Sequence, residues 1–169
     1  MDQLVSFVRE VYGSHGPISL HEPVFTGREK EYVNEAIDST YVSSVGKFVN
    51  RFELDLAAYT GSQQAVATVN GTAALHVALV TCGVVNGDLV ITQSLTFVAT
   101  CNAIRYCGAD PVFVDVDPLT HNIDASKIEI AISSKTKAIM LAHSLGNPFN
   151  LNLVTAICKK YNIWLIEDC

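Results

Sequence analysis

The chain has 169 residues, a formal net charge of −6 and a pI of about 5.2. Apolar residues make up 49% and charged residues 17%, which excludes a disordered chain and fits a folded globular protein. An acidic chain without a basic patch argues against nucleic acid as a partner, and the longest apolar stretch, residues 73–85, is too short to span a bilayer. The first residues are not a signal peptide, so we expect a cytoplasmic protein that binds neither nucleic acid nor membrane.

The cysteines and histidines show no spacing that is typical of a metal site. The five cysteines contain no C-x-x-C pair, so we expect free thiols in a reducing compartment and no metal. The common nucleotide loops, G-x-G-x-x-G and G-x-x-x-x-G-K-[ST], are missing, as is the G-x-S-x-G of many hydrolases.

The first sixty residues predict three helices joined by loops. Residues 3–12 have an amphipathic pattern, and residues 18–25 are expected to be extended. Residues 28–38 and 48–59 carry apolar positions at helical spacing, which predicts faces turned toward a core. Gly61 should end the third helix.

From residue 65 onward, strand and helix patterns alternate. Strands are predicted at residues 65–69, 89–92, 111–115, 137–142 and 163–167, and helices at residues 73–82, 97–107, 125–132 and 151–161. This alternation predicts an α/β fold of right-handed βαβ units with a mainly parallel sheet and flanking helices. Ligands of such sheets bind outside the carboxyl ends of the strands, so the polar residues that follow each strand are candidates for a site.

Two of these strand ends carry the strongest candidates. Gly71 and Thr72 open a helix whose free N–H groups and partial positive charge suit a phosphate, with Thr72 as N-cap. An ordinary βα turn that binds nothing fits the same residues. Asp168 ends the last strand, where a carboxylate either needs a partner or caps a following helix. The chain stops one residue later with no helix to cover that strand, so we expect a fragment of a larger domain.

Six stretches of the chain, taken together, resemble one family: residues 18–23, 41–49, 65–79, 95–100, 111–117 and 166–168. They resemble the DegT/StrS-type sugar aminotransferases, which are pyridoxal-phosphate (PLP) enzymes of fold type I. The resemblance is closest to the branch that aminates UDP-linked 4-keto-6-deoxy-N-acetylhexosamines toward legionaminic-acid-type sugars. It implies an N-terminal segment at residues 1–24 and a partial large domain at residues 25–169, truncated at its carboxyl end.

The resemblance also implies a role for each candidate residue. Gly71, Thr72 and Ala73 would hold the phosphate of PLP. Phe97 would lie against the pyridine ring, although a core phenylalanine at a helix start is the simpler alternative. Asp168 would pair with the pyridine nitrogen and keep it protonated, which makes the ring a better electron sink.

Three further residues are placed at the edge of the site by resemblance. Asn147 would belong to the cofactor site, and Ser43 and Ser44 to the sugar-nucleotide site, although a simple turn and a plain polar loop explain these residues as well. The lysine that forms the Schiff base in the family is expected beyond Cys169, because none of the lysines present follows a strand.

By resemblance, the intact protein would transaminate a nucleotide-linked keto-deoxy sugar in surface-polysaccharide biosynthesis, with glutamate as amino donor, as a homodimer. The 169-residue chain alone is expected to be inactive. Residues 137–168 resemble the 3-dehydrase branch more, which uses the aminated cofactor (PMP) and has histidine in place of the lysine. A third hypothesis is a non-catalytic doubly wound binding domain that is complete at Cys169, which cooperative unfolding of the chain by itself would favour.

Overall fold

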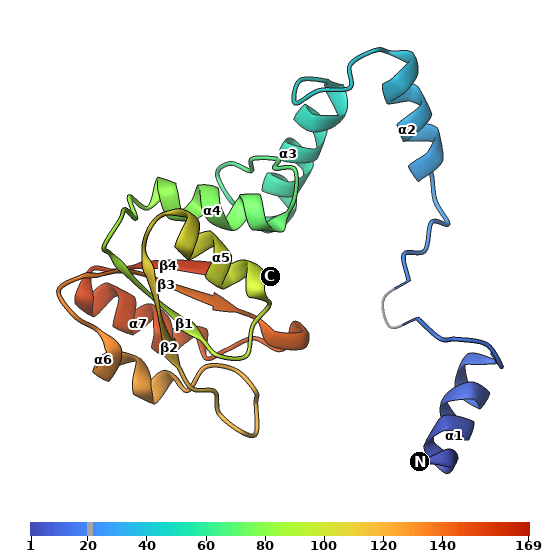
Figure 1. Cartoon of the computed structure of the whole chain (residues 1–169). Coiled ribbons are helices and arrows are strands. Elements are labelled where there is room, and N and C mark those ends of the chain that lie inside the picture. Colours follow the sequence, from blue (N-terminus) through green and yellow to red (C-terminus); the bar gives the residue numbers. More distant parts are fainter. Residues whose placement is uncertain (20–21) are drawn as a thin grey trace. The chain divides into compact units, whose positions relative to one another are not determined.

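The computed structural model describes residues 1–19 and 22–169, which form two compact units, Met1–Ala65 and Val66–Cys169 (Figure 1). Of the segment expected to be extended, residues 18–19 and 22–25 have no regular secondary structure, and residues 20–21 lie outside the described residues. The predicted boundary after residue 24 stays a prediction. No helix in the described part of the chain is long and apolar enough to cross a membrane.

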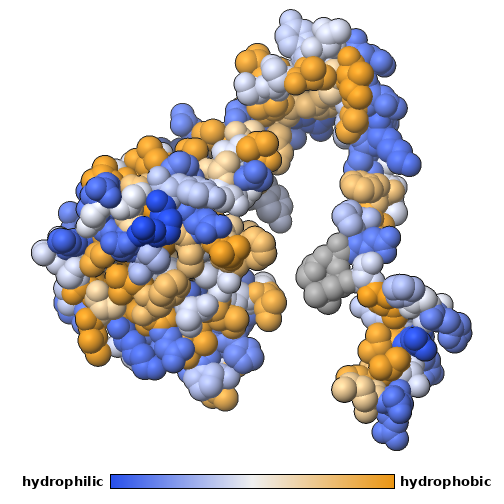
Figure 2. All heavy atoms as spheres, in the orientation of Figure 1, coloured by the Kyte–Doolittle hydropathy of each residue, from blue (hydrophilic) through white to orange (hydrophobic). Residues whose placement is uncertain are grey.

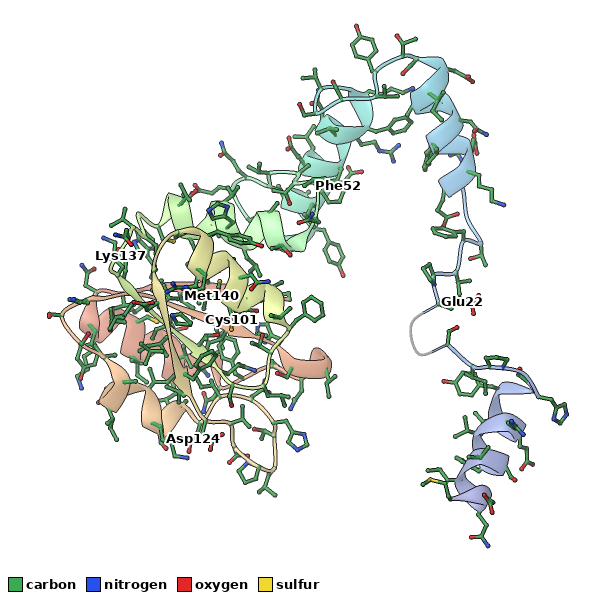
Figure 3. All side chains as sticks on the ribbon, viewed as in Figure 1. Glu22, Phe52, Cys101, Asp124, Lys137 and Met140 are labelled. Atoms are coloured by element: carbon green, nitrogen blue, oxygen red, sulfur yellow. The ribbon has the colours of Figure 1, made fainter. Side chains whose placement is uncertain are left out.

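The first unit contains the three predicted helices. They are α1 (Asp2–Tyr12), α2 (Glu29–Asp38) and α3 (Lys47–Thr60), and Gly61 ends α3 in the left-handed conformation at φ 69°. None of these helices has a buried residue, which corrects the prediction that α2 and α3 face a core. An apolar helix face is buried only where another element packs over it, and apolar side chains such as Phe52 are exposed on this unit (Figures 2 and 3).

The second unit is built on a four-stranded parallel sheet with the order β2-β1-β3-β4. The strands are β1 (Leu89–Gln93), β2 (Asp110–Val114), β3 (Thr136–Ala142) and β4 (Trp164–Asp168). The main helices are α4 (Gly71–Thr81), α5 (Val98–Tyr106) and α7 (Leu151–Tyr161). A turn of 3-10 helix, η1 (Ala125–Lys127), leads into the short α6 (Ile128–Ala131), and a second one, η2 (Ser144–Gly146), follows β3. The predicted parallel sheet with flanking helices is therefore confirmed.

Both faces of the sheet are covered, as apolar strands require. Helices α4 and α5 cover one face and α6 and α7 the other (Figure 1). Val90 and Met140 pack beneath α4 and α5, whereas their neighbours Ile91 and Leu141 pack against α6 and α7. All four side chains are fully buried. Because successive residues of a strand point to opposite faces, each strand delivers its last two side chains to different sides of the sheet.

The predicted strand at residues 65–69 is wrong. These residues are not part of the four-stranded sheet, and Val66 and Val69 are exposed. An apolar, β-branched run has the propensity for a strand, but it becomes one only where a neighbouring strand supplies hydrogen bonds to its backbone.

Candidate functional site

An open cavity of about 400 Å³ lies where β1, β3 and β4 end. It is lined by Leu95, Thr96 and Phe97 after β1, by residues 142–145 after β3, and by Asp168 and Cys169 at the end of β4. Phe97 is the N-cap residue of α5 and its side chain is 76% exposed, so its ring is available to a ligand and is not part of the core. The cavity brings together two of the residues to which the sequence pointed, Phe97 and Asp168.

Asp168 is held firmly at the tip of β4. The backbone N–H of His143 donates to the carbonyl of Asp168 over 2.9 Å, so the ladder between β3 and β4 reaches the last residue of the strand. On the α5 side, the hydroxyl of the fully buried Thr100 donates to Asp168 Oδ2 over 3.0 Å. The carboxylate therefore has a partner, and its second oxygen, Oδ1, meets no donor among the described residues.

The start of α4 offers two free backbone donors. The helix begins at Gly71, and Asn70 is its N-cap, with Oδ1 accepting from the N–H of Ala73 over 2.8 Å. This corrects the prediction of Thr72 as N-cap, because the extended backbone of Asn70 already places its amide oxygen over the first turn. The N–H groups of Gly71 and Thr72 meet no acceptor in the described part of the chain, and a Cβ built on Gly71 would have no atom within 4 Å.

The path of the chain places this helix start at the edge of the sheet where the strands end. Residues 71–81 lead directly into β1, and α4 packs on the sheet through Leu75 and Leu79, so α4 runs antiparallel to the strands (Figure 1). A phosphate at the start of α4 would accept hydrogen bonds from the free N–H groups and gain from the helix dipole.

On the opposite face of the sheet, a buried polar network ties the turns together. Gln93, the last residue of β1, is completely buried, and its Nε2 donates to the carbonyl of Leu95 over 2.8 Å and to Ser144 Oγ over 2.7 Å. Ser144 follows His143 in the sequence, but its hydroxyl accepts from Gln93 and donates to the carbonyl of Leu95. Ser144 and His143 therefore do not form the nucleophile–base pair of a hydrolase. The glutamine at the end of an apolar strand was the only sign of this network in the sequence.

Asn122, also buried, extends the network to the loop before η1. Its Oδ1 accepts from the N–H of Ser144 over 3.3 Å, and its Nδ2 donates to the carbonyl of Asn147 over 2.9 Å. The side chain of Asn147 donates in turn to the carbonyl of Thr120 over 3.0 Å. Asn147 therefore bridges two loops at the rim, and its assignment to the cofactor site stays a prediction. No pattern in the sequence pointed to Asn122.

His143 and Glu167 form a second pair at the strand ends, on the face away from Asp168. His143 Nε2 lies 3.0 Å from Glu167 Oε2, and the imidazole ring stacks on Phe149 with the ring centroids 4.5 Å apart. Cys169, next to this pair, has a thiol whose pKa is raised by burial and then by the carboxylates of Glu167 and Asp168. All five cysteines are free, as the sequence predicted.

Ser43 and Ser44 belong to the first unit. Ser43 lines a hollow of about 620 Å³ between α2 and α3, and its hydroxyl accepts from the N–H of Val45 over 3.3 Å. The role predicted for both serines in sugar binding stays a prediction. Lys137 lies at the beginning of β3 and thus at the edge of the sheet away from the cavity, in line with the expectation that none of the lysines follows a strand (Figure 3).

The groups at the strand ends fit a flat, phosphorylated heteroaromatic ring. An exposed aromatic face, a carboxylate with one free oxygen and two free N–H donors at a helix start can contact a ring, its nitrogen and its phosphate. The described residues contain no group of three or more His, Cys, Asp or Glu that could hold a metal.

Comparisons with known proteins identify the family of the chain. A sequence profile of the DegT/DnrJ/EryC1/StrS aminotransferase family matches residues 24–169. The chain is 45% identical over 152 residues to the GDP-perosamine synthase of Escherichia coli O157:H7, which covers 90% of this chain and 42% of that protein. Its structure is similar to that of an aminotransferase from Psychrobacter cryohalolentis, with a TM-score of 0.83, 36% identity, and coverage of 89% of this chain and 38% of the other.

A GDP-4-keto-6-deoxymannose-3-dehydratase with a trapped PLP–glutamate geminal diamine is also similar, with a TM-score of 0.80, 26% identity, and coverage of 90% and 41% of the two chains. The chain thus spans about 40% of the length of these relatives. Its parallel sheet with flanking helices is that of part of the large domain of PLP-dependent aminotransferases. The chain belongs to the DegT/DnrJ/EryC1/StrS aminotransferase family.

Proposed function

We propose that the protein carrying this chain is a PLP-dependent enzyme that transfers an amino group from glutamate to a nucleotide-linked keto-deoxy sugar for polysaccharide biosynthesis. The observation that carries the proposal is the shared cavity at the strand ends, where the exposed ring of Phe97 and the carboxylate of Asp168 lie together in a chain of this family. A cytoplasmic homodimer is part of the proposal.

Five residues of the chain would hold the cofactor. Gly71 and Thr72 bind the phosphate through their free N–H groups and the threonine hydroxyl, whereas the N–H of Ala73 is already used by the N-cap, so Ala73 contributes only its small size. Phe97 covers one face of the ring, and Asp168 accepts a hydrogen bond from the ring nitrogen. When bound, PLP supplies an electron sink for the electron pair that is released when a substrate C–H bond breaks.

The remaining predicted residues are Asn147 of the second unit and Ser43 and Ser44 of the first. Asn147 braces the loop after β3 by donating to the carbonyl of Thr120, and we propose that it belongs to the cofactor site. Ser43 and Ser44, in a loop of small and hydroxyl residues, offer hydrogen bonds to the sugar nucleotide.

A sugar 3-dehydratase is the second candidate function. It is favoured by the structural likeness to the GDP-4-keto-6-deoxymannose-3-dehydratase and by the sequence of residues 137–168. The residue at the Schiff-base position of the complete gene separates the two functions, with lysine expected for amination and histidine for dehydration.

The nucleotide carried by the sugar is a separate question. The sequence resemblance points to a UDP-linked sugar, whereas the relative from Escherichia coli is named for a GDP-linked one. We retain the UDP-linked 4-keto-6-deoxy-N-acetylhexosamine as the proposed substrate, and turnover of the two sugars by the same preparation decides between them.

The experiment uses the protein expressed from its complete gene, mixed with PLP, glutamate and either sugar nucleotide. Cofactor uptake is followed by visible absorbance and the aminated sugar by mass spectrometry. Asp168→Asn should lower turnover on the order of 10²-fold or more, because the ring nitrogen loses its counter-charge while the fold persists. Asp110→Asn is the matched control, since Asp110 is an exposed carboxylate at the beginning of β2, away from the cavity.

Two results would contradict the proposed function. One is a wild-type protein that takes up no PLP at saturating concentration. The other is an Asp168→Asn protein that turns over at the rate of the Asp110→Asn control.

A further inference from the structure

Two threonines of the α5 segment form a hydrogen-bonded chain that ends on Asp168. Thr96 Oγ1 lies 2.9 Å from Thr100 Oγ1, and Thr100 Oγ1 lies 3.0 Å from Asp168 Oδ2. Thr100 is completely buried and Thr96 is half-buried, so water does not compete freely for either bond.

The direction of these two hydrogen bonds follows from the ionised carboxylate of Asp168 on which they end. An ionised carboxylate can only accept hydrogen bonds, so the single hydroxyl proton of Thr100 points to Asp168 Oδ2. The oxygen of Thr100 must then accept from Thr96, and the protons are ordered as Thr96 to Thr100 to Asp168. An oriented chain of this kind polarises its members and strengthens the last bond, which is made to a charged group.

The same turn of chain carries the aromatic ring of the site. Phe97 lies between the two threonines, immediately before α5 begins at Val98. One short segment therefore fixes both the ring that covers the cofactor and the hydroxyl that holds the carboxylate. Its position against β4 determines how the two groups are placed relative to each other.

We propose that Thr100 is a positioning residue for Asp168, with Thr96 as the donor behind it. Its hydroxyl fixes Oδ2 so that Oδ1 is presented to the ring nitrogen of the cofactor. The proposal rests on the function proposed above, and it adds two residues to which no role has been given. Thr100 is buried and acts through Asp168, whereas Thr96, which also lines the cavity, acts on Asp168 through Thr100.

The chain offers an unusually close control for this proposal. Thr92 on β1 is as completely buried as Thr100, but its Oγ1 has no hydrogen-bond partner among the described residues. Thr92→Val and Thr100→Val therefore make the same change of atoms at equal burial, and only Thr100→Val removes a bond to Asp168.

The experiment measures the dissociation constant of PLP by absorbance titration of the apoprotein, and then kcat and KM for the sugar nucleotide. For Thr100→Val we expect about tenfold weaker PLP binding, which corresponds to about 1.4 kcal/mol. We expect kcat to fall with it while KM for the sugar stays unchanged, because Thr100 contacts no substrate. Thr100→Ser keeps the hydroxyl and should restore both quantities to within about twofold of wild type, and Thr96→Val should give a smaller loss in the same direction.

The outcomes separate this proposal from the proposed function. If Asp168→Asn impairs PLP binding but Thr100→Val and Thr96→Val both behave like Thr92→Val, the positioning role is refuted and the proposed function stands. If Thr100→Ser is as defective as Thr100→Val, packing and not the hydroxyl is responsible, which also refutes it. If wild type binds no PLP or Asp168→Asn is without effect, the proposed function itself fails.

Discussion

The N-cap of α4 allows the structural and the cofactor-binding roles of one turn to be tested separately. Asn70 makes a single capping bond of 2.8 Å to the N–H of Ala73. Asn70→Ala removes that bond and should lower the free energy of unfolding by about 1 kcal/mol. Asn70→Asp keeps an acceptor in place and adds a negative charge that the helix dipole favours by about 0.3–1 kcal/mol, so its stability should equal or exceed that of wild type.

For PLP binding we expect the reverse order, with Asn70→Asp more defective than Asn70→Ala. Two unit charges 4 Å apart interact by about 1 kcal/mol in water and by more where water is partly excluded. A phosphate at the start of α4 carries almost two charges, so Asn70→Asp should weaken PLP binding by about tenfold or more. Asn70→Ala, which adds no charge, should weaken it by less. Because solvent ions screen this repulsion, the defect of Asn70→Asp should shrink as salt is raised.

The assay combines thermal or urea unfolding of the apoprotein with PLP titration at two salt concentrations. Asn150→Asp is the matched control, because Asn150 caps α7 by the same kind of bond, to the N–H of Leu153 over 3.2 Å, at a helix to which no phosphate is assigned. If Asn70→Asp binds PLP as tightly as wild type, or no less tightly than Asn150→Asp, the phosphate does not lie at the start of α4 and the reasoning is wrong.

Two further predictions concern the framework of the second unit. Leu79→Ala should lower the free energy of unfolding by about 2–5 kcal/mol, since the side chain of Leu79 is fully buried between α4 and the sheet, whereas Val80→Ala, at an exposed position of the same helix, should change it by less than about 0.5 kcal/mol; urea unfolding of both variants tests this. Gly108→Ala should be more destabilising than Gly87→Ala. Both glycines have positive φ, but a Cβ at Gly108 would lie 2.9 Å from Oδ1 of Asn86, whereas a Cβ at Gly87 would have no atom within 4 Å. Equal unfolding midpoints for the two variants would contradict this prediction.

The parts of the fold that depend on local pattern could be predicted from the sequence. Each of the four strands found contains a short apolar run, and a run of this kind can be recognised without knowing what packs beside it. The run at residues 65–69 has the same appearance, but its state depends on a partner strand elsewhere, which no local pattern can reveal. The prediction that α2 and α3 turn their apolar faces toward a core was wrong for the same reason, because the burial of a helix face depends on what packs against it.

The site was predictable where one residue carries the chemistry and unpredictable where several share it. Asp168 stands out as an acid at the end of an apolar strand. Thr100, in contrast, is one threonine in an ordinary helical pattern, and only the packing of α5 beside β4 brings it to Asp168. Gln93 and Asn122 likewise acquire partners far along the chain, which appear only in three dimensions.

The pairing of β3 with β4 has a consequence for the chemistry of the site. Glu167 and Asp168 are adjacent acids, aligned with Leu141 and Ala142, and they serve opposite faces of the sheet. A slip of β4 by a single residue would put Glu167 or Cys169 in the place of Asp168, depending on its direction, so the cavity would receive the wrong side chain while the acid content and net charge of the chain stayed the same. Strand register is thus as much a determinant of the site as the identity of its residues, so an insertion or deletion in the short connection between α7 and β4 would threaten it without altering either acid.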